Sequence, residues 1–117
     1  MITSRDLSPT AQYYIPLITD RLRLLNPAKV ILFGSHAYGE SRANSDLDLL
    51  VVLNSDIAPE TYREKESLYL QVARALRDIR GQVSIDLIVH TRPMHDQFIA
   101  LDSLFAQEIL NRGITIL

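Results

Sequence analysis

The chain contains no cysteine and no tryptophan, and only 4 of its 117 residues are glycine. Without cysteine, neither a disulfide framework nor a cysteine-ligated zinc or iron–sulfur site is possible. No apolar run approaches the ~20 residues that a membrane-spanning helix needs. The first residues also lack the basic-then-apolar pattern of a secretory signal. We therefore expect a cytoplasmic protein that has no membrane partner.

Neither sign of charge dominates, because 12 basic and 14 acidic side chains give a net charge of −2. A dedicated nucleic-acid-binding protein is usually basic, so we expect no direct contact with nucleic acid. Hydrophobic residues make up 47% of the chain, which is enough to form a real core. The sequence has no repeat and no interior linker, and its length predicts a single domain over 1–117.

The hydrophobic pattern predicts helices that alternate with short strands. Ser8-Pro9 is typical of a helix start, and we expect Pro16 to break or kink this helix before Asn26-Pro27 ends it. The other expected elements are strands over 29–33, 47–53 and 83–89, a helix from 59 or 60 to 81, a helical region over 93–112 that restarts at Ser103, and a short edge strand over 114–117. This order predicts an α/β or α+β fold in which a small sheet packs against about four helices.

One motif has residue types that suit phosphate chemistry: Gly34-Ser35, then ten intervening residues, then Asp46-Leu47-Asp48. At the end of a strand, a glycine lets backbone N–H groups approach a phosphate, and the serine hydroxyl adds a donor. Asp46 and Asp48 lie at i and i+2 in the next strand, so both carboxylates point from the same face. Because such carboxylates repel each other, Mg²⁺ is the natural partner, and two ions would support in-line displacement at phosphorus.

Asp86 is a third candidate ligand. It lies in the apolar strand over 83–89, on the face opposite the alternating apolar side chains. A carboxylate there is costly to bury without a partner, which is either a shared metal ion or an arginine in an ordinary ion pair. In the first case, we predict that Asp46, Asp48 and Asp86 converge beside Ser35. Their mutual repulsion should then raise the pKa of at least one of them.

These residues resemble the signature of the minimal nucleotidyltransferases, which are small members of the DNA polymerase beta superfamily. The resemblance rests on Ile31-Leu32-Phe33-Gly34-Ser35 and on Ser45-Asp46-Leu47-Asp48-Leu49-Leu50-Val51-Val52. It implies a mixed sheet with helices packed around it, two Mg²⁺ ions as cofactors and ATP as the substrate. The implied catalytic and metal-binding residues are Asp46, Asp48 and Asp86, and the implied nucleotide-binding residues are Gly34, Ser35, Arg42 and Ser45.

The stretch that follows Gly34-Ser35 departs from the pattern of that family. Family members often carry an arginine there, whereas this chain has His36-Ala37-Tyr38-Gly39-Glu40. Either Arg42 supplies the cationic contact to phosphate, or that contact is weaker. We expect His36 either to contact the nucleotide or to lie at the surface near it. His90 and His95 lack the i, i+4 spacing of a helical zinc pair, so we expect loop or capping roles for them.

Two other phosphate-binding motifs are excluded. A P-loop would need a lysine where the chain has Glu40, whose charge would repel phosphate. A Rossmann fingerprint would need a second glycine where the chain has His36.

The resemblance also implies a biological role. Many minimal nucleotidyltransferases are antitoxins that form a hetero-oligomer with a HEPN-domain ribonuclease toxin and add AMP from ATP to one of its tyrosines. By resemblance, this chain would be such a protein adenylyltransferase. Two alternatives stay open at this point. One is nucleotidyl transfer to a small molecule such as an aminoglycoside, and the other is a non-catalytic antitoxin that acts by binding alone.

Overall fold

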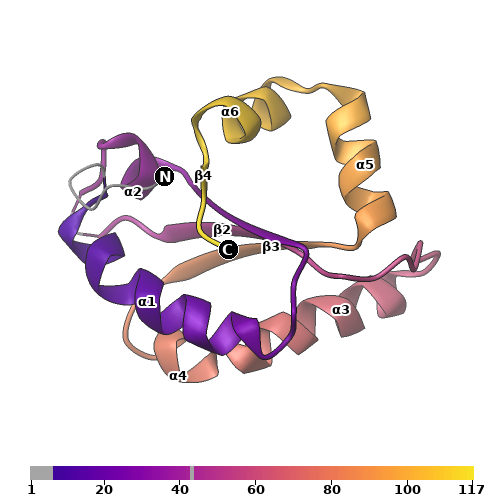
Figure 1. Ribbon diagram of the computed structural model, residues 1–117, viewed down its shortest axis with the longest axis horizontal. Helices are drawn as coiled ribbons and strands as arrows, with labels where there is room; N and C mark the ends of the chain where they lie inside the picture. The colour runs from indigo at the N-terminus through magenta and orange to yellow at the C-terminus, as the bar shows by residue number, and fades with distance from the viewer. Residues whose placement is uncertain (1–6, 43) are drawn as a thin grey trace.

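The structure, a computed structural model, describes residues 7–42 and 44–117. Its centre is a four-stranded mixed sheet in the order β3-β2-β1-β4, with helices on both faces (Figure 1). The strands are β1 (Lys29–Phe33), β2 (Leu47–Val52), β3 (Ile85–His90) and β4 (Ile114–Thr115). The helices are α1 (Pro9–Arg23), α2 (Ser35–Tyr38), α3 (Tyr62–Ala75), α4 (Arg77–Arg80), α5 (Arg92–Leu101) and α6 (Leu104–Arg112). The predicted fold class is confirmed.

No helix within the described residues has the length and apolar character of a membrane span. The first six residues, on which the expectation of no signal sequence depends, lie outside the described part of the chain.

Strand β2 lies between an antiparallel neighbour, β1, and a parallel neighbour, β3. The register pairs Asp48 with Phe33 on one side and with Asp86 on the other. Directly paired residues project from the same face of a sheet, so the two carboxylates stand next to each other. The candidate site is built on this row.

The sheet separates two cores. Helices α1, α3 and α4 cover one face, where the buried strand residues include Val30, Leu32, Leu49, Val51 and Leu87. Helices α5 and α6 cover the other face, where the buried residues are Ile31, Phe33, Leu50 and Ile109. Asp48 and Asp86 belong to the second face by strand alternation, one step beyond its buried apolar residues.

Helix α1 begins at Pro9 as predicted, and the Ser8 side chain accepts a hydrogen bond from the Ala11 N–H at 3.0 Å. Of the break or kink expected at Pro16, the break is wrong, because α1 continues through it to Arg23. Pro16 is exposed, so water can reach this side of the helix, where a proline leaves one carbonyl group without its usual N–H partner.

The helix predicted from 59 or 60 to 81 is instead two helices, and the first begins at Tyr62. Thr61 caps it by accepting a hydrogen bond from the Glu64 N–H at 3.1 Å. The Glu64 carboxylate in turn accepts from the Glu60 N–H at 2.8 Å. This Thr-x-x-Glu pattern is a start signal that could have been recognised in the sequence.

Other boundaries follow the sequence more closely. The restart at Ser103 is confirmed, since its side chain caps α6 by accepting from the Ala106 N–H at 3.0 Å. Strand β3 begins at Ile85 rather than at Val83, because the Val83 N–H bonds to the Ile79 carbonyl group at 3.1 Å in the turn after α4. The predicted edge strand is present as β4, which pairs with β1.

Candidate functional site

Asp48 and Asp86, here called the acidic pair, line an open cavity of about 380 Å³ at the N-terminal ends of β2 and β3. Gly34 and Ser35 line the same cavity, so the structure brings four of the predicted site residues together. Apolar walls come from Phe33, Ile88 and Phe105, and the remaining lining residues are Tyr38, Glu40 and Glu108.

The acidic pair carries an unfavourable interaction that a cation would relieve. Partial burial, then the charge of Asp86 and then that of Asp46, raise the pKa of Asp48 from 3.8 to about 6. The direction of the predicted rise is therefore confirmed for Asp48, but burial contributes more to it than the mutual repulsion from which it was predicted. A cation bound between the two carboxylates would replace this repulsion by attraction and would lower the pKa again.

Gly34 is required by both its conformation and its contacts. Its φ of 76° lies in the left-handed region, and a Cβ atom at this position would collide with the Asp48 carboxylate. The chain turns here from β1 into the single turn of α2, whose Tyr38 N–H bonds to the Gly34 carbonyl group at 3.1 Å. The first N–H groups of a helical turn have no partner inside it, so they are available to phosphate oxygens.

The other predicted site residues lie in the loop that leads into β2. Asp46 is exposed directly before the strand, and its charge acts on Asp48. The Ser45 hydroxyl accepts a hydrogen bond from the Arg42 N–H at 2.9 Å, and Arg42 is exposed. None of these three is among the described residues that line the cavity. The catalytic and metal-binding role of Asp46 and the nucleotide contacts of Arg42 and Ser45 therefore stay predictions.

His36 corrects both expectations made for it. It is only 2% exposed, so it neither lies at the surface nor faces a ligand. Its Nδ1 atom lies 2.7 Å from the Ser8 hydroxyl, and its Nε2 atom lies 2.9 Å from the Ser45 carbonyl oxygen. Because the carbonyl group can only accept, Nε2–H donates to it. The ring thus ties the start of α1 to the residue before Asp46, over a sequence separation that no local pattern reveals.

The carboxylate oxygens of the acidic pair suit Mg²⁺ as ligands. Within residues 7–42 and 44–117, no group of three or more histidine or carboxylate side chains is arranged to hold a metal ion. Mg²⁺ is usually held by one or two carboxylates together with water and substrate phosphate, rather than by an all-protein cage. Asp48 and Asp86 supply two such hard oxygen ligands beside the segment suited to phosphate. The residues present therefore fit the ion.

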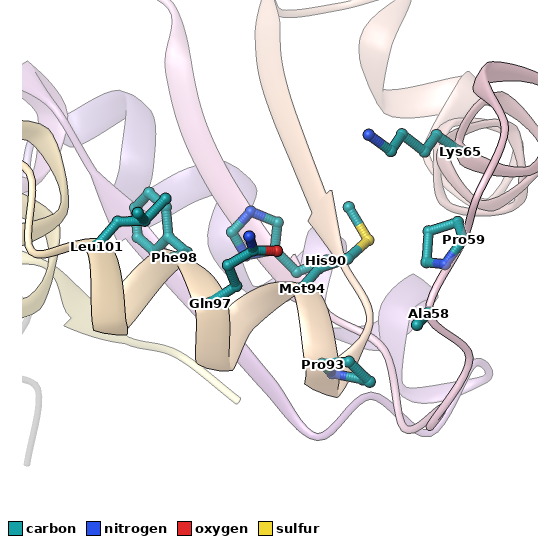
Figure 2. A pocket seen from close by; sticks show the side chains of 9 residues that line it. All are labelled: Ala58, Pro59, Lys65, His90, Pro93, Met94, Gln97, Phe98 and Leu101. Atoms are coloured by element: carbon teal, nitrogen blue, oxygen red, sulfur yellow. The ribbon is translucent and has the colours of Figure 1, made fainter.

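A second group of titratable residues lies at the opposite end of β3. His90 and His95, the histidine pair, are each 8% exposed, and their Nδ1 atoms lie 3.1 Å apart. His90 lines a separate cavity of about 290 Å³ with Met94 and Phe98 (Figure 2). The expectation of loop or capping roles for these histidines is therefore wrong, because a strand end and a helix bury them against each other.

The histidine pair is electrically neutral near neutral pH. Burial, followed by the charge of His95, lowers the pKa of His90 to about 4. Burial also lowers the pKa of His95. One Nδ1 atom then carries the proton and donates to the other.

Comparison with known families identifies the chain. The family model described as Polymerase beta, Nucleotidyltransferase matches residues 18–117, so the chain belongs to this family. The acidic pair beside Gly34-Ser35 is the part of this nucleotidyltransferase domain that suits phosphate chemistry. No curated protein sequence matches the chain significantly.

Several solved structures share the fold, among them two of toxin–antitoxins. A crystal structure of a toxin–antitoxin with AMP-PNP is 20% identical, with a TM-score of 0.53 over 88% of this chain and 72% of that one. A crystal structure of the toxin–antitoxin MntA-HpeT is 17% identical, with a TM-score of 0.51 over 88% of this chain and 71% of that one. That second protein is a mutant in which two aspartates, two positions apart, are replaced by glutamate.

Proposed function

We propose that this protein is a Mg²⁺-dependent adenylyltransferase that acts as an antitoxin. Its substrates are ATP and a tyrosine of a HEPN-domain ribonuclease toxin. The observation that carries the proposal is the acidic pair, which stands beside Gly34 and Ser35 in one cavity. Phosphate-binding and metal-binding groups are thereby adjacent, as nucleotidyl transfer requires.

Each side chain has a distinct role in this reaction. The Ser35 hydroxyl and the backbone after Gly34 hold the triphosphate, and Asp48 and Asp86 hold Mg²⁺. When bound, Mg²⁺ neutralises charge on the phosphates and on the acceptor oxygen. Asp86 is the exposed member of the pair, so we assign to it the acceptance of the hydroxyl proton.

The bonds change at the α-phosphorus of ATP. The tyrosine oxygen forms a new P–O bond there, the bond between the α-phosphorus and the bridging oxygen breaks, and diphosphate leaves. The product is a tyrosine that carries AMP through a phosphodiester bond.

A protein acceptor is supported by the surface next to the cavity. Phe105 forms part of the cavity wall and is 46% exposed, and Leu104, which precedes it in the chain, is 84% exposed. Exposed apolar groups around a polar site are typical of surfaces that bind protein. The two solved structures compared above are toxin–antitoxins, and one of them is described with AMP-PNP.

The test is transfer of AMP to a HEPN-domain protein encoded beside this chain. Wild-type protein, ATP and Mg²⁺ should give an AMP adduct on a partner tyrosine, detected by mass spectrometry of the intact protein and its peptides. Asp86→Asn should give no adduct. Asp20→Asn, a matched change of an exposed aspartate in α1, the helix that covers the opposite face of the sheet, should give the wild-type yield.

Two results would contradict the proposal. The first is an absence of adduct with the wild type, together with full rescue by Asp86→Asn of the growth of cells that express the partner. This combination would show that the protein neutralises its partner by binding alone. An adduct of equal yield with Asp86→Asn would place the chemistry elsewhere.

A further inference from the structure

The cavity of the acidic pair is unusually negative for a site that must take a triphosphate. Four carboxylate side chains line it, from Asp48, Asp86, Glu40 and Glu108. Its described lining residues include no lysine and no arginine. Metal ions at the acidic pair would offset Asp48 and Asp86, but they would leave the two glutamates facing the phosphates.

Arg112, at the end of α6, contacts the wall that these glutamates form. Its Nη2 atom lies 3.1 Å from Oε1 of Glu40, and its Nη1 atom lies 3.8 Å from Oε1 of Glu108. The centre of its guanidinium group lies 4.1 Å from the centroid of the Tyr38 ring. All three partners line the cavity. Arg112 is therefore a cation that contacts three residues of this wall.

The geometry of these contacts leaves the guanidinium group available to a ligand. Stacking on an aromatic ring occupies the face of the group, while its N–H donors point outward in the plane. Those donors now meet carboxylate oxygens, which phosphate oxygens can replace in the same fork-like arrangement. The side chain is 47% exposed, so a nucleotide entering from solvent can reach it.

We propose that Arg112 binds the phosphates of the nucleotide and exchanges its contacts with Glu40 and Glu108 for phosphate oxygens. This inference rests on the proposed function and adds a specific phosphate ligand to it. The Tyr38 ring stacks against the face of the guanidinium group and holds it in place, while the two glutamates keep it beside the cavity until the nucleotide binds.

The test measures the affinity of the whole chain for AMP-PNP with Mg²⁺ by isothermal titration calorimetry. Arg112→Gln should weaken binding about tenfold or more, the range expected when a hydrogen bond to a charged group is lost. Arg92→Gln is the matched control. Arg92 forms a 3.0 Å pair with Asp56, and its side chain is 43% exposed, but it is not among the described residues of this cavity. Its loss should change the affinity by less than about twofold.

A second set of variants tests whether Arg112 contacts phosphate directly or only balances the charge of the two glutamates. In Glu40→Gln with Glu108→Gln, the carboxylates that Arg112 neutralises are gone. If Arg112 binds phosphate itself, Arg112→Gln should still weaken AMP-PNP binding about tenfold in this background. If the loss disappears there, Arg112 only balances the glutamates and the inference is overturned.

The outcomes also distinguish this inference from the function on which it rests. Equal affinities of wild type and Arg112→Gln would overturn the role of Arg112 and leave the nucleotide site intact. A wild-type protein that does not bind AMP-PNP with Mg²⁺ would overturn the proposed function as well.

Discussion

The two ends of strand β3 hold titratable side chains in opposite ways. At its N-terminal end, the acidic pair places like charges side by side, and partial burial together with these charges raises the pKa of Asp48 to about 6. At its C-terminal end, the histidine pair is buried but neutral, and one hydrogen bond of 3.1 Å joins the two rings. The repulsion at the acidic end is left for a cation to relieve, whereas the two histidine rings at the other end are hydrogen-bonded to each other. Like charges held side by side thus distinguish the end that we propose to be functional from the end that holds neutral rings.

The largest expected effect is a difference in catalytic rate between a substitution at the acidic end and one at the histidine end. Asp86→Asn should lower the rate of AMP transfer about 10³-fold, because a metal ligand and a proton acceptor are lost together. His90→Gln, at the other end of the same strand, should stay within about threefold of wild type. The comparison fails if both substitutions lower the initial rate, measured with labelled ATP, by similar factors.

The second effect concerns stability at the histidine end. His95→Ala should lower the free energy of unfolding by about 2–3 kcal/mol, because it opens a cavity and leaves the buried His90 ring without its partner. Urea unfolding near neutral pH measures this change. Asp96→Ala, an exposed neighbour on the same helix, is the control and should stay within about 0.5 kcal/mol. A loss for His95→Ala no larger than that of the control would mean that the pair contributes nothing.

The sequence predicted the acidic end because its signal is local. Asp46 and Asp48 are two positions apart, and Gly34-Ser35 directly follows a clear apolar strand, so their chemistry is visible without a fold. The adjacency of Asp48 and Asp86 also needed the parallel register of β2 and β3, which no local pattern gives. A likeness to a known signature supplied that step.

The interactions that the sequence did not reveal are long-range. His36 meets Ser8 across 28 positions, and Arg112 meets Glu40 across 72. Single histidines and arginines carry no periodicity that would indicate such partners. The low helix propensity of proline also led to the wrong prediction of a break at Pro16, where exposure of the residue lets a helix tolerate a proline.

The third effect is the pH dependence of stability, which should differ between the two ends of β3. A carboxyl group whose pKa is raised by folding binds its proton more tightly in the folded state, so stability falls as pH rises from 3.8 to about 6. Asp48→Asn should therefore gain about 1–3 kcal/mol near neutral pH and almost nothing below the lower value. Urea unfolding at both pH values measures this difference. An equal gain at both would show that packing, not charge, is responsible.

At the histidine end, stability changes with pH in the opposite direction. A histidine whose pKa is lowered by folding contributes stability that is present above 6.5 and is lost as pH falls toward about 4. His90→Gln should therefore flatten the loss of stability in this interval, while Asp48→Asn should not. A wild-type slope in the His90→Gln protein would contradict this assignment.

The smallest expected effect is the response to Mg²⁺ alone. Mg²⁺ should stabilise wild type by less than about 1 kcal/mol, since few protein ligands are offered before the nucleotide binds. Asp46→Asn with Asp48→Asn should abolish the shift in melting temperature, and His90→Gln should preserve it. A Mg²⁺ shift of equal size in the double variant would place the ion outside the acidic end.

The most direct test of the account is the position of a divalent ion in crystals grown with AMP-PNP and Mn²⁺, which replaces Mg²⁺ and gives an anomalous signal. The account predicts an anomalous peak within ligand distance of the Asp48 and Asp86 carboxylates, with the phosphates beside Gly34 and Ser35. A nucleotide bound elsewhere, or a peak at the histidine pair and none at the acidic pair, would contradict it.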